Sequence, residues 1–316
     1  MHPVLYDIVD SVEYVYSYSC QRFITRSLDE EFDVKRIELK NLKRGDIPAG
    51  SRIISRLKLK TVSPNVAVLA EKLPQDRVLF VYEQDTWINF MTGHPLRESY
   101  SVIRDFLHPT FIVGSSDFWA NRVRELGIKC VFAQPWVPPD FCVDLHKPWK
   151  EKKFDVVFCG SLYPTREMFF RDLKARDINV KVFSMLDTKT YFQVLNDSRI
   201  AIRTEPTRGS YAFGDITSVN GLWFRDVEAA SQGCFSMREH DSEYDAQNLS
   251  LVPSIKTFYN SQDAADKIKF YLNECADQDL VIKSSIDYVK APFEHNTQTS
   301  YYGCWKSVAK AVRNMS

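Results

Sequence analysis

The chain has 316 residues, with 41 basic and 41 acidic side chains and therefore a formal net charge of zero. This balance argues against bulk nucleic-acid binding through a basic surface. The length predicts about two domains. Seven cysteines, an odd number without a C-x-x-C pair, predict buried thiols in a reducing, cytoplasmic compartment. No apolar run is long enough to span a membrane, and the first residues lack the basic cluster of a signal peptide.

The first half of the chain predicts strands that alternate with helices. Apolar runs of strand length occupy residues 4–9, 33–39, 77–82, 109–116 and 129–137, and helical patterns occupy 17–31 and 117–126. Residues 51–59 carry several basic side chains, and a further lysine follows at position 60. We expect a solvated helix face there, and the alternative is contact with a charged acceptor or an anionic membrane surface.

Two carboxylates and a histidine follow the apolar strand predicted at residues 77–82. They are Glu83, Asp85 and His94. Ligands of open α/β sheets bind beyond the carboxyl ends of the strands, so these side chains are candidates for catalysis. The alternative is that they are solvated loop residues.

A proline-rich segment at residues 135–153 predicts a linker between two domains. Strands are then expected at 154–160, 180–184 and 199–205, with helices between them that reach residue 175 and cover 188–198. A loop of about fourteen residues follows, and loops of that length are usually functional or mobile. This order predicts an α/β fold with doubly wound parallel sheets.

The segment Thr217–Gly233 contains the pattern R-x-x-E-x-x-x-x-G. Asn220 begins a turn signal, and Arg225 and Glu228 share one face of the helix that follows. A helix start next to an arginine-rich loop is a site where anions bind. The alternative is an exposed ion pair on a packed helix, which would contribute ~0.3 kcal/mol.

The residues Arg225, Val227, Glu228, Ala229, Ala230 and Gly233 resemble the nucleotide-binding segment of GT-B glycosyltransferases. The pattern is most similar to the "glycosyl transferases group 1" type, including its spore-maturation-like branch. The resemblance implies that Glu228 binds the ribose hydroxyls of a nucleotide sugar. Many retaining members have a second glutamate eight positions earlier, where this chain has Asn220, so the stereochemistry stays open.

The resemblance implies a two-domain enzyme with a cleft between Rossmann-like domains. Residues 1–145 would bind the acceptor, 146–299 would bind the nucleotide sugar, and a last helix at 300–316 would return to the first domain. The donor phosphates would be bound by Gly160, Ser161, Arg166, Arg203, Arg208 and Arg225. These arginines can replace a metal, so we expect no metal and no cofactor beyond a UDP- or GDP-sugar. Asp85 is the first candidate for the base, followed by Glu83 and His94.

We therefore expect a hexosyltransferase-like enzyme of glycan or glycoconjugate biosynthesis. Its acceptor would be a glycan, a lipid-linked group or a small molecule, with peripheral membrane contact as an option. Two alternatives remain open. One is a nucleotide-sugar epimerase or hydrolase of the same fold, and the other is a nucleotide-binding protein without catalysis.

Overall fold

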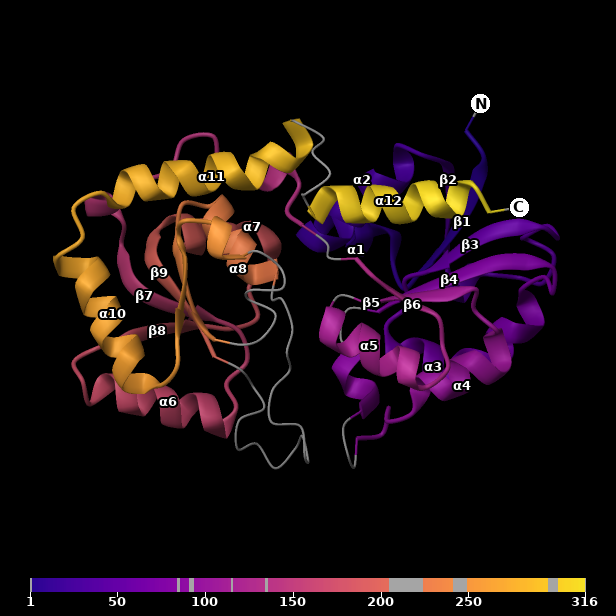
Figure 1. Cartoon of the computed structure of the whole chain (residues 1–316), viewed down its shortest axis with the longest axis horizontal. Coiled ribbons are helices and arrows are strands. Elements are labelled where there is room, and N and C mark those ends of the chain that lie inside the picture. Colours follow the sequence, from indigo (N-terminus) through magenta and orange to yellow (C-terminus); the bar gives the residue numbers. More distant parts are fainter. Residues whose placement is uncertain are drawn as a thin grey trace. The chain divides into compact units, whose positions relative to one another are not determined.

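The computed structural model describes residues 2–83, 86–90, 94–114, 116–133, 136–204, 224–240, 249–294 and 301–315. These residues form two compact units (Figure 1). The first unit contains the chain up to Trp136 together with the last helix, and the second runs from Val137 to the end of the preceding helix. Among the cysteines whose side chains are described, all are free thiols and all but Cys275 are buried, as predicted.

The first unit is built on a parallel sheet whose described strands lie in the order β2-β1-β3-β4-β5-β6. These strands are β1 (Val4–Val9), β2 (Asp33–Glu38), β3 (Ser51–Ser55), β4 (Arg77–Glu83), β5 (Phe111–Gly114) and β6 (Cys130–Phe132). Ile8 of β1 and Val81 of β4 both lie opposite Ser55 of β3, so these three strands end at the same edge. The strand order reverses between β1 and β3, and such a switch point is where open α/β sheets bind ligands.

Helices cover both faces of this sheet. They are α1 (Val12–Ser17), α2 (Ser19–Asp29), α3 (Leu59–Lys72), α4 (Ser99–Leu107), α5 (Asp117–Glu125) and α12 (Tyr301–Arg313). Helices α3, α4 and α5 share an apolar cluster with Ile53 and Val81 of the sheet. Tyr82 points to the opposite face, where its ring centre lies 5.1 Å from that of Trp305 on α12. Helix α12 also packs beside α2 (Figure 1), so the last helix belongs to the first unit.

The expectation of a solvated helix over residues 51–59 is wrong, because the first part of this segment forms strand β3. Ile53 and Ile54 are both fully buried. Successive side chains of a strand point to opposite faces, so both faces of β3 are covered. Arg56 contributed to the expectation of a charged surface, yet it is buried because Asp7 of β1 pairs with it.

The second unit repeats this topology. Its described strands lie in the parallel order β11-β10-β9-β7-β8, so the order again reverses, here between β7 and β9. The predicted strands at 154–160, 180–184 and 199–205 are confirmed. The five strands are β7 (Phe154–Cys159), β8 (Val180–Phe183), β9 (Ser198–Arg203), β10 (Phe235–Glu239) and β11 (Ile255–Phe258).

The helices of the second unit are α6 (Pro164–Lys174), α7 (Thr188–Asn196), α8 (Phe224–Ser231), α10 (Ser261–Asn273) and α11 (Gln278–Glu294). Helices α6 and α10 pack with Phe158 on one face of the sheet, and α7 and α8 pack with Val157 on the other. Gly233 follows α8 with a φ of 69°, and a Cβ there would lie 2.7 Å from Cβ of His146. Both the backbone conformation and the space require glycine at this helix end.

The predicted α/β class with doubly wound parallel sheets is confirmed in both units. Within the described ranges, no helix combines the length and the apolar character needed to cross a membrane.

Candidate functional site

Several predicted phosphate-binding residues lie at the switch point of the second unit. Gly160 follows β7, and Arg203 is the last residue of the neighbouring strand β9. Arg225 lies in the first turn of α8. The parallel sheet places these residues at one edge, although they are far apart in the sequence.

Two arginines converge on one main-chain oxygen at the end of β7. Arg225 Nη1 donates to the carbonyl of Cys159 at 2.7 Å, and Arg203 Nη1 donates to the same carbonyl at 3.2 Å. Arg203 Nη2 also donates to the carbonyl of Arg225 at 3.4 Å. A carbonyl oxygen is uncharged, so these bonds orient the guanidinium groups without neutralising them.

Gly160 leaves the space that the Arg225 guanidinium occupies. A Cβ at position 160 would lie 3.0 Å from Arg225 Nη1 and 3.1 Å from the ring of Phe158. A larger residue would therefore displace one of these groups. The absent side chain also leaves the backbone at the end of β7 open to close approach by a ligand.

Arg166 connects the loops that follow β7 and β9. Its Nη1 donates to the carbonyl of Ser161 at 2.8 Å, and its Nη2 donates to the carbonyl of Thr204 at 3.2 Å. The guanidinium lies 5.0 Å from the ring centre of Phe158 and 5.2 Å from that of Tyr163. Burial, together with the two neighbouring arginines, lowers the pKa of Arg166 to about 10. A buried cation in this setting is stabilised by a nearby negative group.

Glu228 is held by a tyrosine that no sequence motif singles out. The hydroxyl of Tyr191, on α7, donates to Glu228 Oε2 at 2.9 Å and accepts from Arg203 Nη2 at 3.2 Å. Glu228 is only 2% exposed. Burial and the Glu228 carboxylate raise the pKa of Tyr191 well above its usual value, so the hydroxyl keeps its proton and donates. This hydrogen-bonded series fixes the direction of the carboxylate.

The described residues of this cluster carry more positive than negative charge. Arg166, Arg203 and Arg225 form no ion pair with a described carboxylate, and their hydrogen-bond partners among the described residues are carbonyls and the tyrosine hydroxyl. Asp226 is buried, pairs with Arg238 of β10 at 3.2 Å and also acts electrostatically on Arg203, so it offsets part of the positive charge. Together with Glu228, two carboxylates then face the guanidiniums of Arg166, Arg203, Arg225 and Arg238, so the described cluster stays positive and can stabilise a bound anion.

The other predicted site residues fall in different places. Asp85, Arg208 and Asn220 lie outside the described residues. The backbone of Glu83 ends strand β4 at the carboxyl edge of the first sheet. His94 lies in the same unit and is described in full.

His94 lines a pocket of about 500 Å³ at the switch point of the first unit. The other lining residues come mostly from the segments that follow β1 and β3 and from the end of β4, and include Tyr14, Gln21, Arg56, Lys58, Lys60 and Tyr82. Each unit therefore has polar side chains gathered at the edge where its strand order reverses.

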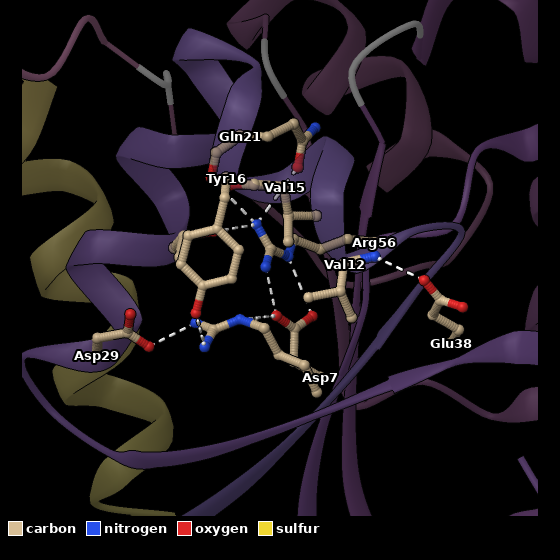
Figure 2. A network of polar contacts seen from close by, with 10 residues as sticks. Asp7, Val12, Val15, Tyr16, Gln21, Asp29, Glu38 and Arg56 are labelled. Carbon is tan, nitrogen blue, oxygen red and sulfur yellow. Dashed lines mark hydrogen bonds and ion pairs between the residues drawn. The ribbon is translucent and has the colours of Figure 1, made fainter. Parts of the chain in front are cut away.

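An ion-pair network with the buried pair Asp7–Arg56 at its centre borders this pocket (Figure 2). Asp7 of β1 accepts from Arg56 Nε at 3.0 Å and also binds Arg56 Nη2. Arg56 Nη1 donates to the carbonyl of Gln21 at 3.2 Å. Arg36 of β2 lies within 3.4 Å of the same aspartate and pairs with Asp29. Two arginines are balanced by two carboxylates, so the network joins β1, β2, α2 and the residue after β3 without adding net charge to the pocket.

Hydrogen bonding assigns the tautomer of His94. Its Nδ1 accepts the backbone N–H of Leu96 at 3.0 Å. In the neutral ring the proton therefore resides on Nε2, which then donates rather than accepts. This arrangement suits a hydrogen-bond donor to a ligand better than a general base.

No family model matches the sequence, and no curated protein matches it. Solved structures do match. HepE from Anabaena, in complex with UDP and glucose, has a TM-score of 0.63 and 10% identity over 99% of this chain and 100% of that one. TarM has a TM-score of 0.56 and 11% identity over 83% of this chain, which spans only 55% of TarM.

A third match is an alpha-glucosyltransferase in complex with UDP and a 13-mer DNA. Its TM-score is 0.55 at 9% identity, and the match covers 95% of this chain and 99% of that one. Identities this low establish the fold alone. The chain has the fold of the GT-B glycosyltransferases.

Proposed function

We propose that the chain is a glycosyltransferase that moves a sugar from a nucleoside diphosphate sugar to an acceptor hydroxyl. The observation that carries this proposal is the group of three arginines at the switch point of the second unit, where the described carboxylates do not balance their charge. The diphosphate leaving group gains negative charge as the sugar departs, and preorganised guanidiniums stabilise that charge. The complexes of HepE and the alpha-glucosyltransferase with UDP support the choice of donor.

Each residue of the cluster has a proposed role. Arg203 and Arg225 bind the diphosphate, with the backbone at Gly160 and Ser161 approaching it closely. Glu228 accepts hydrogen bonds from the ribose hydroxyls. Both terminal nitrogens of Arg166 bind carbonyls, so its role is to hold the two loops and add positive charge. Arg208 and Asn220 are further proposed donor contacts.

The first unit is proposed to supply the acceptor site and the base. Asp85 is the first proposed base and Glu83 the second, while His94 is proposed to donate a hydrogen bond. The domain assignment of residues 1–145, 146–299 and 300–316 to acceptor, donor and returning helix is part of this proposal. So are catalysis without a metal and a UDP- or GDP-sugar as the donor.

The acceptor is proposed to be a glycan, a lipid-linked group or a small molecule. The neutral net charge is not sufficient to exclude nucleic acid, since the alpha-glucosyltransferase complex contains DNA with an HMU base. The cytoplasmic location and a place in glycan biosynthesis remain proposals as well.

Calorimetry with UDP and GDP, each with and without Mg²⁺, tests the donor site. We expect one nucleotide to bind without metal, and Arg225→Gln or Glu228→Gln to weaken it by roughly ten- to 150-fold, the equivalent of a charge-assisted hydrogen bond of ~1.5–3 kcal/mol. Arg171→Gln is the matched control, because Arg171 is an exposed residue of α6 in the same unit. Equal affinity in all variants would remove the cluster from donor binding.

Product analysis then separates the reactions. Transfer to an added acceptor supports the proposed activity, whereas free sugar without an acceptor indicates a hydrolase and an altered donor sugar indicates an epimerase. Tight nucleotide binding without turnover of any UDP- or GDP-sugar would instead indicate a binding protein.

A further inference from the structure

We propose that the pocket of the first unit binds a negatively charged group, such as a phosphate monoester, and that Lys58 and Lys60 hold it. The identification of this ligand as the acceptor rests on the proposed function. The anion site itself rests on the pocket alone.

The place and size of the pocket mark it as a ligand site. It lies at the carboxyl ends of β1, β3 and β4, where the order of the sheet reverses. Its volume of about 500 Å³ falls within the roughly 300–1,000 Å³ of small-molecule sites. The apolar side chains of Leu57, Ile88 and Leu96 supply part of the wall, so the ligand has a less polar body beside its charged group.

The charge of the described lining is positive. The charge of Arg56 is neutralised within the Asp7 network (Figure 2), so it adds no net charge to the pocket. Lys58 and Lys60 are exposed lining residues, and neither forms an ion pair with a described carboxylate. These two ammonium groups are therefore the charges available to a ligand.

Two neighbouring contacts define where this charge is held. Lys58 Nζ lies 4.6 Å from the ring centre of Tyr14, which is another lining residue. An aromatic face attracts an ammonium group without neutralising it. The Asp10 carboxylate accepts the backbone N–H of Lys58 at 3.2 Å, so it offsets part of the positive charge.

The two lysines lie at the start of α3. Lys58 precedes the first residue of this helix and Lys60 is the second, and the first turn contains no acidic residue. Cations at a helix start are opposed by the macrodipole, whereas an anion there is stabilised by it. A bound anion would therefore offset both the dipole and the two ammonium groups.

Glucose 6-phosphate is the probe for this site, and methyl glucoside is its uncharged counterpart. Binding is measured by calorimetry and located by hydrogen exchange of residues 56–66. We expect the phosphate to bind and protect this segment, and the double substitution Lys58→Gln and Lys60→Gln to weaken it about tenfold or more. Lys43→Gln is the control, because Lys43 is an exposed lysine of the same unit outside the pocket lining.

Asp10→Asn is a test of opposite sign. The asparagine keeps an acceptor for the Lys58 backbone N–H but removes a negative charge beside the lysines, so the phosphate should bind more tightly. Vesicles that contain phosphatidylglycerol form a second arm. Lysine-dependent binding of vesicles without binding of glucose 6-phosphate would assign the anion to a lipid-linked ligand, and the reverse would assign it to a soluble one.

Two results would overturn the proposal. One is binding of methyl glucoside as tight as that of the phosphate and insensitive to both lysines. The other is that neither phosphate-bearing probe binds or protects residues 56–66. Failure of the proposed function is a separate result, because UDP affinity reports on the second unit. If UDP does not bind while glucose 6-phosphate still protects this segment, the anion site remains supported. Only its identification as the acceptor site is then lost.

Discussion

Tyr191→Phe examines whether the carboxylate of Glu228 depends on the hydrogen bond from α7. The substitution removes one oxygen atom and keeps the ring that packs in the apolar cluster beneath α7 and α8. Glu228 Oε2 then loses a donor at 2.9 Å, and Arg203 Nη2 loses an acceptor at 3.2 Å. Because Glu228 is charged and almost fully buried, we expect a loss of ~1.5–3 kcal/mol of stability in the second unit.

On the proposed role of Glu228 in ribose binding, UDP affinity should fall as well, because the carboxylate no longer has a fixed direction. A loss of about 1 kcal/mol corresponds to roughly fivefold weaker binding. Calorimetry with UDP measures this change. Hydrogen exchange of the α8 amides measures stability, since a chain with two units need not unfold in one step.

A double-mutant cycle with Glu228→Gln isolates the contact. We expect a coupling energy of ~0.5–3 kcal/mol between positions 191 and 228, as for residues in one hydrogen-bond network. Tyr259→Phe is the control, since Tyr259 is 60% exposed in the same unit. A coupling of zero, with stability and UDP affinity equal to those of the unchanged protein, would refute the positioning role of Tyr191.

Four further predictions follow from individual contacts. Gly160→Ala should weaken UDP binding in calorimetry, because the new Cβ would lie 3.0 Å from the guanidinium that the glycine accommodates; unchanged affinity would contradict this role. Asp7→Ala should cost the first unit ~3–5 kcal/mol by leaving Arg56 buried without its partner, and hydrogen exchange should show the second unit unaffected. Asp85→Asn should reduce turnover by ~10²-fold or more if it is the base, with UDP affinity preserved; full activity would remove it from the mechanism. Burial lowers the pKa of Lys152 from 10.5 to about 8. Between these two pH values the unfolded chain binds more protons than the folded chain, so the free energy of unfolding should rise with pH. Lys152→Met should abolish that rise, as measured by urea titrations at several pH values.

The local pattern of apolar residues and glycines predicted most of the helices and strands. Apolar runs such as those at 77–82 and 154–160 form buried parallel strands because covered sheets need apolar side chains on both faces. Gly233 ended the helix as expected, since only glycine fits its backbone and its contact with His146. Strand β3 was missed because basic residues flank its two isoleucines, and the partner that buries Arg56 lies 49 residues away.

The sequence by itself determined the α/β class, the strand–helix alternation and the residues around Glu228, because all of these depend on local spacing. Only the tertiary structure decided that Arg203 and Arg225 share the carbonyl of Cys159 and that Tyr191 holds Glu228. Periodicity sets the face of a helix or strand on which a side chain lies, but strand order and helix packing select its partner. Both sites lie where that order reverses, so contacts remote in sequence define them.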